Sequence, residues 1–126
     1  MIYLELNSHM IEQYQYAYYI YSEIINKYQE QAEILNQMKQ FCSMQKSIQI
    51  NENIDFYIHK IMVMIYMYNK IDNVLATVDK SDLQIHKLFY KNKLSLNKIA
   101  AKTEMASDNI SKVLFNITEL IKNDNI

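Results

Sequence analysis

Residues 94–114 read LSLNKIAAKTEMASDNISKVL, and the order of polar and apolar residues in this segment predicts two helices joined by a tight turn. Ser95 is placed to cap a short helix over residues 95–103, and a tight turn is predicted at residues 104–106. A longer helix is predicted over residues 107–122, because apolar residues recur there at spacings of four, three and four: Ile110, Leu114, Ile117 and Ile121. A short helix, a tight turn and a longer helix form the layout of a helix-turn-helix.

The segment before this stretch predicts one more helix. Ser81 and Gln84 have the spacing of a capping box, with Ser81 as the N-cap, so we expect a helix over residues 82–91. The small side chain of Ala100 allows the following helix to cross closely, and Met105 can plug the core from the turn. We therefore expect a helix-turn-helix domain over residues 80–126.

The run from Leu88 to Leu120 resembles the region-four helix-turn-helix of bacterial sigma factors. It is most similar to the related C-terminal domain of small phage late-gene transcription regulators. In those proteins a helix ending near a Tyr leads into a Leu-Ser-x-x-x-Ile-Ala segment, and an Ile or Val follows eleven residues after that Ile. Here residues 94–100 fit the segment, while Tyr90 and Ile110 fall on the other two positions.

The resemblance implies an all-helical DNA-binding transcription regulator encoded by a phage or mobile element. Two residues stand where that family has glycine: Glu104 in the turn and Lys93 after the preceding helix. A left-handed backbone at Glu104 would cost about 1 kcal/mol.

The resemblance also implies that the last helix lies in the major groove of double-stranded DNA, where Asn pairs with adenine and Lys with guanine. Lysines on the flanking helices would then meet phosphates, although an ordinary solvated face is the alternative interpretation. Asp108 at the start of the last helix opposes the approach of phosphate. The predicted DNA-binding residues are Ser107, Asn109, Ser111, Lys112 and Asn116 on the last helix, with Lys91, Lys93, Lys98 and Lys102 beside it.

Two long helices are predicted in the N-terminal part, residues 1–79. The first spans residues 8–40, and the second spans residues 53–78 with Asn51 or Asn53 as its cap. Each carries an apolar stripe at alternating spacings of three and four: Ile11, Tyr14, Tyr18, Tyr21, Ile25, Tyr28, Ala32 and Leu35, then Ile54, Tyr57, Ile61, Met64, Tyr68, Ile71, Leu75 and Val78.

Two helices joined in this way most simply form an antiparallel hairpin. The alternative is a coiled-coil-like pairing between two chains through the Tyr-rich helices, which would give a homodimer. The expected architecture is thus all-α, with a long N-terminal helical hairpin followed by a three-helix helix-turn-helix unit.

Composition supports helices over sheets. The 126 residues include no Gly and no Pro, on which tight sheet turns depend. Residues 1–79 hold five Lys against nine acids, which gives −4, whereas residues 80–126 hold eight Lys against five acids, which gives +3. This asymmetry is a mild sign of a polyanionic partner for the C-terminal part, and ordinary surface charge is the alternative interpretation, which the charge alone favours.

No residue pattern indicates catalysis, a metal site or a cofactor. The three His residues are far apart, and the one Cys, Cys42, fits a reducing compartment. The longest apolar run, Ile61 to Tyr68, is far shorter than the roughly 20 residues that span a bilayer, and the start of the chain does not read as a signal peptide. We expect a cytoplasmic protein that is not an enzyme and does not enter membranes.

Two function classes follow. The first is a transcription regulator that binds double-stranded DNA and docks on RNA polymerase or dimerises through its N-terminal helices. The second is a small protein-interaction module, or a phage-encoded inhibitor, that binds a protein partner without DNA.

Overall fold

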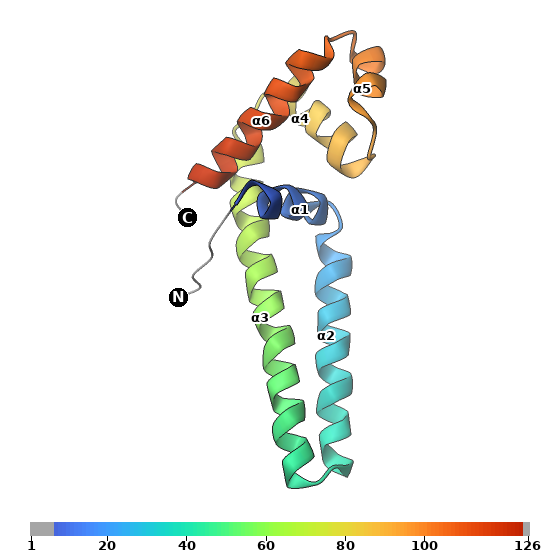
Figure 1. Cartoon of the computed structure of the whole chain (residues 1–126), viewed down its shortest axis with the longest axis vertical. Coiled ribbons are helices and arrows are strands. Elements are labelled where there is room, and N and C mark those ends of the chain that lie inside the picture. The colour runs from blue at the N-terminus through green and yellow to red at the C-terminus, as the bar shows by residue number, and fades with distance from the viewer. Residues whose placement is uncertain (1–6, 125–126) are drawn as a thin grey trace. The chain divides into compact units, whose positions relative to one another are not determined.

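The computed structural model describes residues 7–124, which form helices and contain no strand. The all-helical class predicted from the sequence is therefore confirmed. In chain order the elements of Figure 1 are α1 (Ser8–Tyr18), α2 (Tyr21–Met38), the 3-10 helix η1 (Lys39–Phe41), α3 (Met44–Leu75), α4 (Lys80–His86), the π-helix η2 (Lys87–Lys91), α5 (Leu96–Thr103) and α6 (Ser107–Asn123).

The chain divides into two compact units. Unit 1 takes its described residues from 7–19 and 68–124, and unit 2 is Ile20–Met67. This division differs from the expected boundary after residue 79. The reason is that α1 and the last turns of α3 bury apolar side chains against α6.

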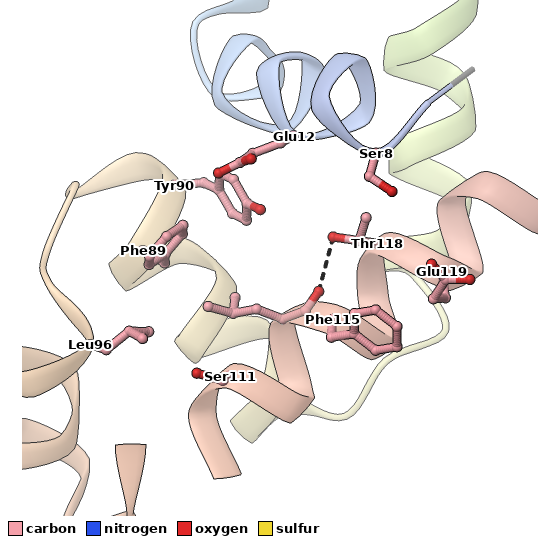
Figure 2. A pocket seen from close by; sticks show the side chains of 10 residues that line it. Ser8, Glu12, Phe89, Tyr90, Leu96, Ser111, Phe115, Thr118 and Glu119 are labelled. Carbon is pink, nitrogen blue, oxygen red and sulfur yellow. Dashed lines mark hydrogen bonds between the residues drawn. The ribbon is translucent and has the colours of Figure 1, made fainter. Parts of the chain in front are cut away.

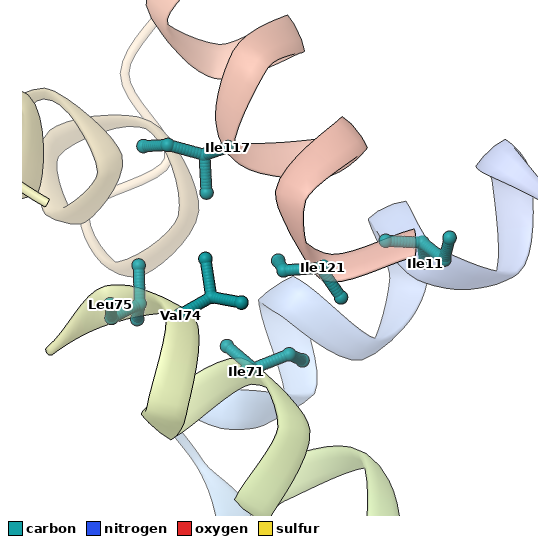
Figure 3. Packing of buried hydrophobic residues seen from close by; sticks show 6 residues of the cluster. All are labelled: Ile11, Ile71, Val74, Leu75, Ile117 and Ile121. Carbon is teal, nitrogen blue, oxygen red and sulfur yellow. The ribbon is translucent and has the colours of Figure 1, made fainter. Parts of the chain in front are cut away.

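Unit 1 contains two apolar clusters, and α6 contributes to both. The α1–α3–α6 cluster has buried side chains that point toward one another from three helices (Figure 3): Ile11, Ile71, Val74, Leu75, Ile117 and Ile121. The α4–α6 cluster is built from α4, η2, α5 and α6: Ile85, Leu88, Tyr90, Ile99, Ile110 and Leu114. The predicted inward stripe of the last helix is confirmed, since all four of its residues are buried.

The prediction of one helix over residues 8–40 is wrong. Asn7 caps α1 by accepting a hydrogen bond from the Met10 N–H at 2.9 Å. The helix ends at Tyr18, and Ile20 then leaves the helical region with φ −120° and ψ 26° before α2 starts. The apolar spacing continues in register across this break, so periodicity could not reveal it.

The predicted start of the second long helix is also wrong. Ser43 precedes α3, and its Oγ accepts a hydrogen bond from the Lys46 N–H at 3.3 Å. Asn51 and Asn53 therefore lie inside α3 and cap nothing. No Gly or Pro stands between residues 44 and 53 to interrupt the helix, so it extends back to the serine.

In unit 2, α2 and the first part of α3 run in opposite directions (Figure 1). The rings of Tyr28 and Tyr57 lie 6.1 Å apart between the two helices. The buried apolar side chains of this unit are few: Ile50, Val63, Met64 and Met67. Within unit 2 two helices alone face each other, so little apolar surface is enclosed between them.

The capping box predicted at Ser81 and Gln84 is wrong. Asp79 is the residue before α4, with an extended backbone and no side-chain cap, and Ser81 lies within the first turn. From Lys87 the helix widens into η2, where the Asn92 N–H bonds the Lys87 carbonyl at 3.0 Å. The chain leaves η2 through Lys93, which has a left-handed backbone with φ 56°.

Candidate nucleic-acid interface

The start of α5 is built as the sequence predicts. Ser95 has an extended backbone, and its Oγ accepts a hydrogen bond from the Lys98 N–H at 3.2 Å. Ile99 is completely buried, and Ala100 packs at the edge of the α4–α6 cluster. One face of this short helix is thereby packed in the α4–α6 cluster, and the opposite face is exposed to solvent.

The turn between α5 and α6 depends on Glu104. This residue has φ 60° and ψ 25°, the left-handed conformation that glycine adopts without cost. Lys93 and Glu104 are the non-glycine residues with positive φ among residues 7–124. Met105 packs against the α4–α6 cluster from the turn, as expected.

The first turn of α6 has no side-chain cap. Ala106 precedes the helix with an extended backbone, and the hydroxyl of Ser107 instead donates to Asn97 Oδ1 of α5 at 3.4 Å. This contact ties the two helices together across the turn. It also directs Ser107 toward α5, so that its side chain is half-buried and less accessible than the other predicted contacts.

Three of the predicted base-contacting residues share one exposed surface of α6. Asn109, Lys112 and Asn116 are exposed, and at 3.6 residues per turn they fall within about 60° of one another, away from the buried stripe. Ser111 is exposed but lies closer to the buried side, where it lines a pocket. We call Asn109, Lys112 and Asn116 the α6 polar face.

All four predicted phosphate-contacting lysines are exposed. Lys98 and Lys102 are four residues apart on α5, so they share its outer side. Lys91 ends η2, and Lys93 follows it with the left-handed backbone. The same side of α6 also carries acidic groups, since Asp108 is exposed and Glu119 is half-buried. The positive charge therefore comes mainly from η2 and α5.

A buried polar chain lies beneath α6 in unit 1. Thr118 Oγ1 donates to the Leu114 carbonyl at 3.0 Å, and it accepts from Gln15 Nε2 at 3.0 Å. Gln15 Oε1 therefore faces His86 and accepts from its Nε2 at 2.9 Å. This leaves His86 Nδ1 to accept from the Tyr19 hydroxyl at 2.6 Å. Every member thus has a partner, as buried polar groups require.

Burial shifts the pKa values of this chain. It lowers the pKa of His86 to about 4, because charging a buried imidazole removes it from water. It raises the pKa of Tyr19 above its usual range for the same reason. The imidazole is therefore neutral at pH 7, which is the state that the hydrogen bonds require.

Neither Gln15 nor His86 belongs to a motif that predicts a buried polar chain. Their positions in the apolar pattern are the one sign in the sequence that these two residues are buried. Gln15 follows Ile11 by four residues, and His86 lies between Ile85 and Leu88. Polar residues at such inward positions need buried partners. Their partners are as many as 103 residues away in the sequence, so spacing could not identify them.

In the part of the chain that the structure describes, no group of three or more His, Cys, Asp or Glu residues could hold a metal ion. Among those same residues, no helix has the length and hydropathy needed to cross a membrane. No family model, curated protein or solved structure matches the chain.

Proposed function

We propose that this chain is a DNA-binding transcription regulator, with α5, the turn and α6 acting as a helix-turn-helix over residues 80–126. In this proposal α6 enters the major groove of double-stranded DNA and its polar face meets base edges. The observation that carries the proposal is the two-sided character of α6. One side is buried in both clusters, and the other presents Asn109, Lys112 and Asn116.

The turn residues support the same proposal. Glu104 and Lys93 hold the left-handed conformation at the positions where sigma-factor region four and the phage regulators have glycine. Strain of about 1 kcal/mol at a non-glycine residue persists when the surrounding packing determines the backbone. A sigma-like regulator, encoded by a phage or mobile element, would act in the cytoplasm and contact RNA polymerase at the promoter.

The lysines define the expected salt dependence. If Lys91, Lys93, Lys98 and Lys102 each neutralise one phosphate, log K should fall with log salt at a slope of about −4. Asp108 and Glu119 repel phosphate, so they favour a small number of specific contacts over broad electrostatic binding.

Gel retardation with fragments of the native genome at low salt tests this proposal. The double variant Asn109→Ala/Lys112→Ala should weaken binding by roughly 30-fold or more, since each of the two lost base contacts costs about 1–3 kcal/mol. The matched control is Asn26→Ala/Lys27→Ala, which removes the same two residue types from exposed positions on α2 in unit 2. We expect the control to bind DNA as the wild type does.

The absence of retardation by the wild type at low salt would contradict the proposal. Equal loss in the α6 variant and in the α2 control would contradict it as well. Both variants alter exposed side chains, so thermal melting should confirm that each is folded before its binding is measured.

A second candidate function is a protein-interaction module, and the surface of unit 2 favours it. Phe41 is 89% exposed and Met44 is 83% exposed, with Ile34, Met38 and Ile48 half-exposed near them in sequence. Such residues suit a protein partner, either RNA polymerase or a second copy of this chain in a homodimer. Size measurement in solution with Phe41→Ser and Met44→Ser tests the homodimer. A mass that is one chain for wild type and variants alike would exclude it.

A further inference from the structure

A pocket of about 310 Å³ lies in unit 1 between α1, η2, α5 and α6 (Figure 2). Its wall is apolar, with Phe89 from η2, Leu96 from α5, and Leu114 and Phe115 from α6. This volume falls at the lower end of the roughly 300–1,000 Å³ typical of small-molecule sites. The pocket therefore has room for a compact ligand with one ring.

The polar lining of this pocket is negative. Glu12 reaches toward it from α1 and Glu119 borders it from α6 (Figure 2), whereas no lysine or histidine lines it. Across residues 7–124 neither carboxylate forms an ion pair. Burial is the main cause that raises the pKa of Tyr90 in the pocket wall to about 12. The neighbouring Thr118 opposes this rise, and the Glu12 carboxylate adds to it.

The backbone that supplies the aromatic wall is unusual. Phe89 and Tyr90 belong to η2, a π-helical turn, and such turns are rare and occur often at functional sites. The rings of Phe89 and Tyr90 are 4.8 Å apart in an edge-on arrangement, and Tyr16 of α1 packs on Tyr90 at 4.7 Å. These contacts hold the aromatic wall in place before any ligand arrives.

We propose that this pocket binds a small organic ammonium ion carried on an aromatic or branched apolar body. The body would fill the space against Phe89, Leu96 and Leu114. The negative charge of Glu12 and Glu119 in the pocket lining would attract the cation, with the ring of Phe115 available for a cation–π contact. A neutral ligand leaves the two carboxylates without a counter-charge, and an anion is repelled by both.

Three probes that share one ring and differ in charge test the proposal: phenethylamine, phenethyl alcohol and phenylpropionate. Each is titrated into the full chain without DNA, and binding is followed in two-dimensional amide NMR spectra. We expect phenethylamine to shift the amide signals of Phe89, Leu114 and Phe115 with a dissociation constant in the millimolar range or lower. The alcohol and the acid should bind at least about fivefold more weakly.

The variant Glu12→Gln/Glu119→Gln should reduce the affinity for the amine by about fivefold, to that of the alcohol. The matched control is Glu30→Gln/Glu33→Gln, which changes two exposed glutamates of α2 and should bind the amine as the wild type does. If the first variant does not fold, Phe115→Ala replaces it. That side chain is 62% exposed, and its loss should weaken amine binding without unfolding the protein.

Three outcomes overturn the proposal: no shifts at the pocket residues, equal affinity for all three probes, or unchanged affinity in the glutamate variant. Because no DNA is present, a failure here leaves the proposed DNA-binding function untouched. A failure of DNA binding likewise leaves this site untouched.

Discussion

Unit 1 and unit 2 both carry many apolar side chains on their helices, but they bury them very differently. Unit 1 encloses two apolar clusters and a complete polar chain, with several side chains fully inaccessible. Unit 2 leaves Phe41, Met44 and many other large apolar side chains exposed. Helical periodicity alone therefore does not determine which apolar side chains are buried. Burial follows from how many neighbouring helices an apolar face meets.

The largest expected effect comes from truncating the centre of unit 1. Ile110 is fully buried in the α4–α6 cluster, so Ile110→Ala should lower the free energy of unfolding by about 2–5 kcal/mol. The same change at Ile34, which is 50% exposed on α2, should stay within about 0.5 kcal/mol. Urea unfolding measures both. Similar losses at the two positions would contradict the contrast between the units.

The next largest effect is the dependence of the free energy of unfolding on pH, which arises from His86. Its pKa is about 4 in the folded protein and 6.5 in the unfolded chain. Between these values the unfolded chain binds more protons, so the free energy of unfolding falls as pH falls through this window. The loss from pH 7 to pH 4 should be about 3 kcal/mol, at about 1.4 kcal/mol per pKa unit.

Urea unfolding at pH 7, 5.5 and 4 measures this loss. The variant His86→Gln should show a flatter dependence over the same window, because the titrating group is gone. His59→Gln, at an exposed position on α3, controls for the removal of a histidine. If His86→Gln kept the wild-type slope, another group would have to account for the pH dependence.

The smallest expected effect has opposite signs in the two units. Glu104→Gly in unit 1 should stabilise the protein by up to about 1 kcal/mol, because glycine relieves the left-handed strain at φ 60°. Part of this gain is lost to the greater freedom of glycine in the unfolded chain. Glu33→Gly on α2 should instead destabilise by about 1 kcal/mol, as glycine does within an exposed helix. Thermal melting compares them, and a destabilising Glu104→Gly would show that the turn carries no strain.

Much of the C-terminal part was predictable from the sequence. Ser95 as the cap and the buried stripe from Ile110 to Ile121 both follow from local patterns, and both are observed. Such features involve residues within a few positions of one another. The exposure of Asn109, Lys112 and Asn116 follows from the same periodicity.

The remaining features could not be predicted in this way. The break at Tyr19–Ile20 keeps the apolar register, and the start of α3 at Met44 depends on Ser43 instead of the asparagines. The pocket and its two glutamates come from helices that lie about 100 residues apart in the sequence.

An all-helical chain follows from the sequence, because it has no glycine or proline and its apolar residues recur with helical spacing. The sequence also determines which side of α6 turns inward. The tertiary structure alone decided that α1 and the end of α3 join the C-terminal helices, and that Gln15, His86 and Thr118 form one polar chain. These two kinds of feature differ in how far apart in the sequence the interacting residues lie. Helical periodicity acts over a few residues, whereas the choice of partner for each face depends on contacts between distant segments.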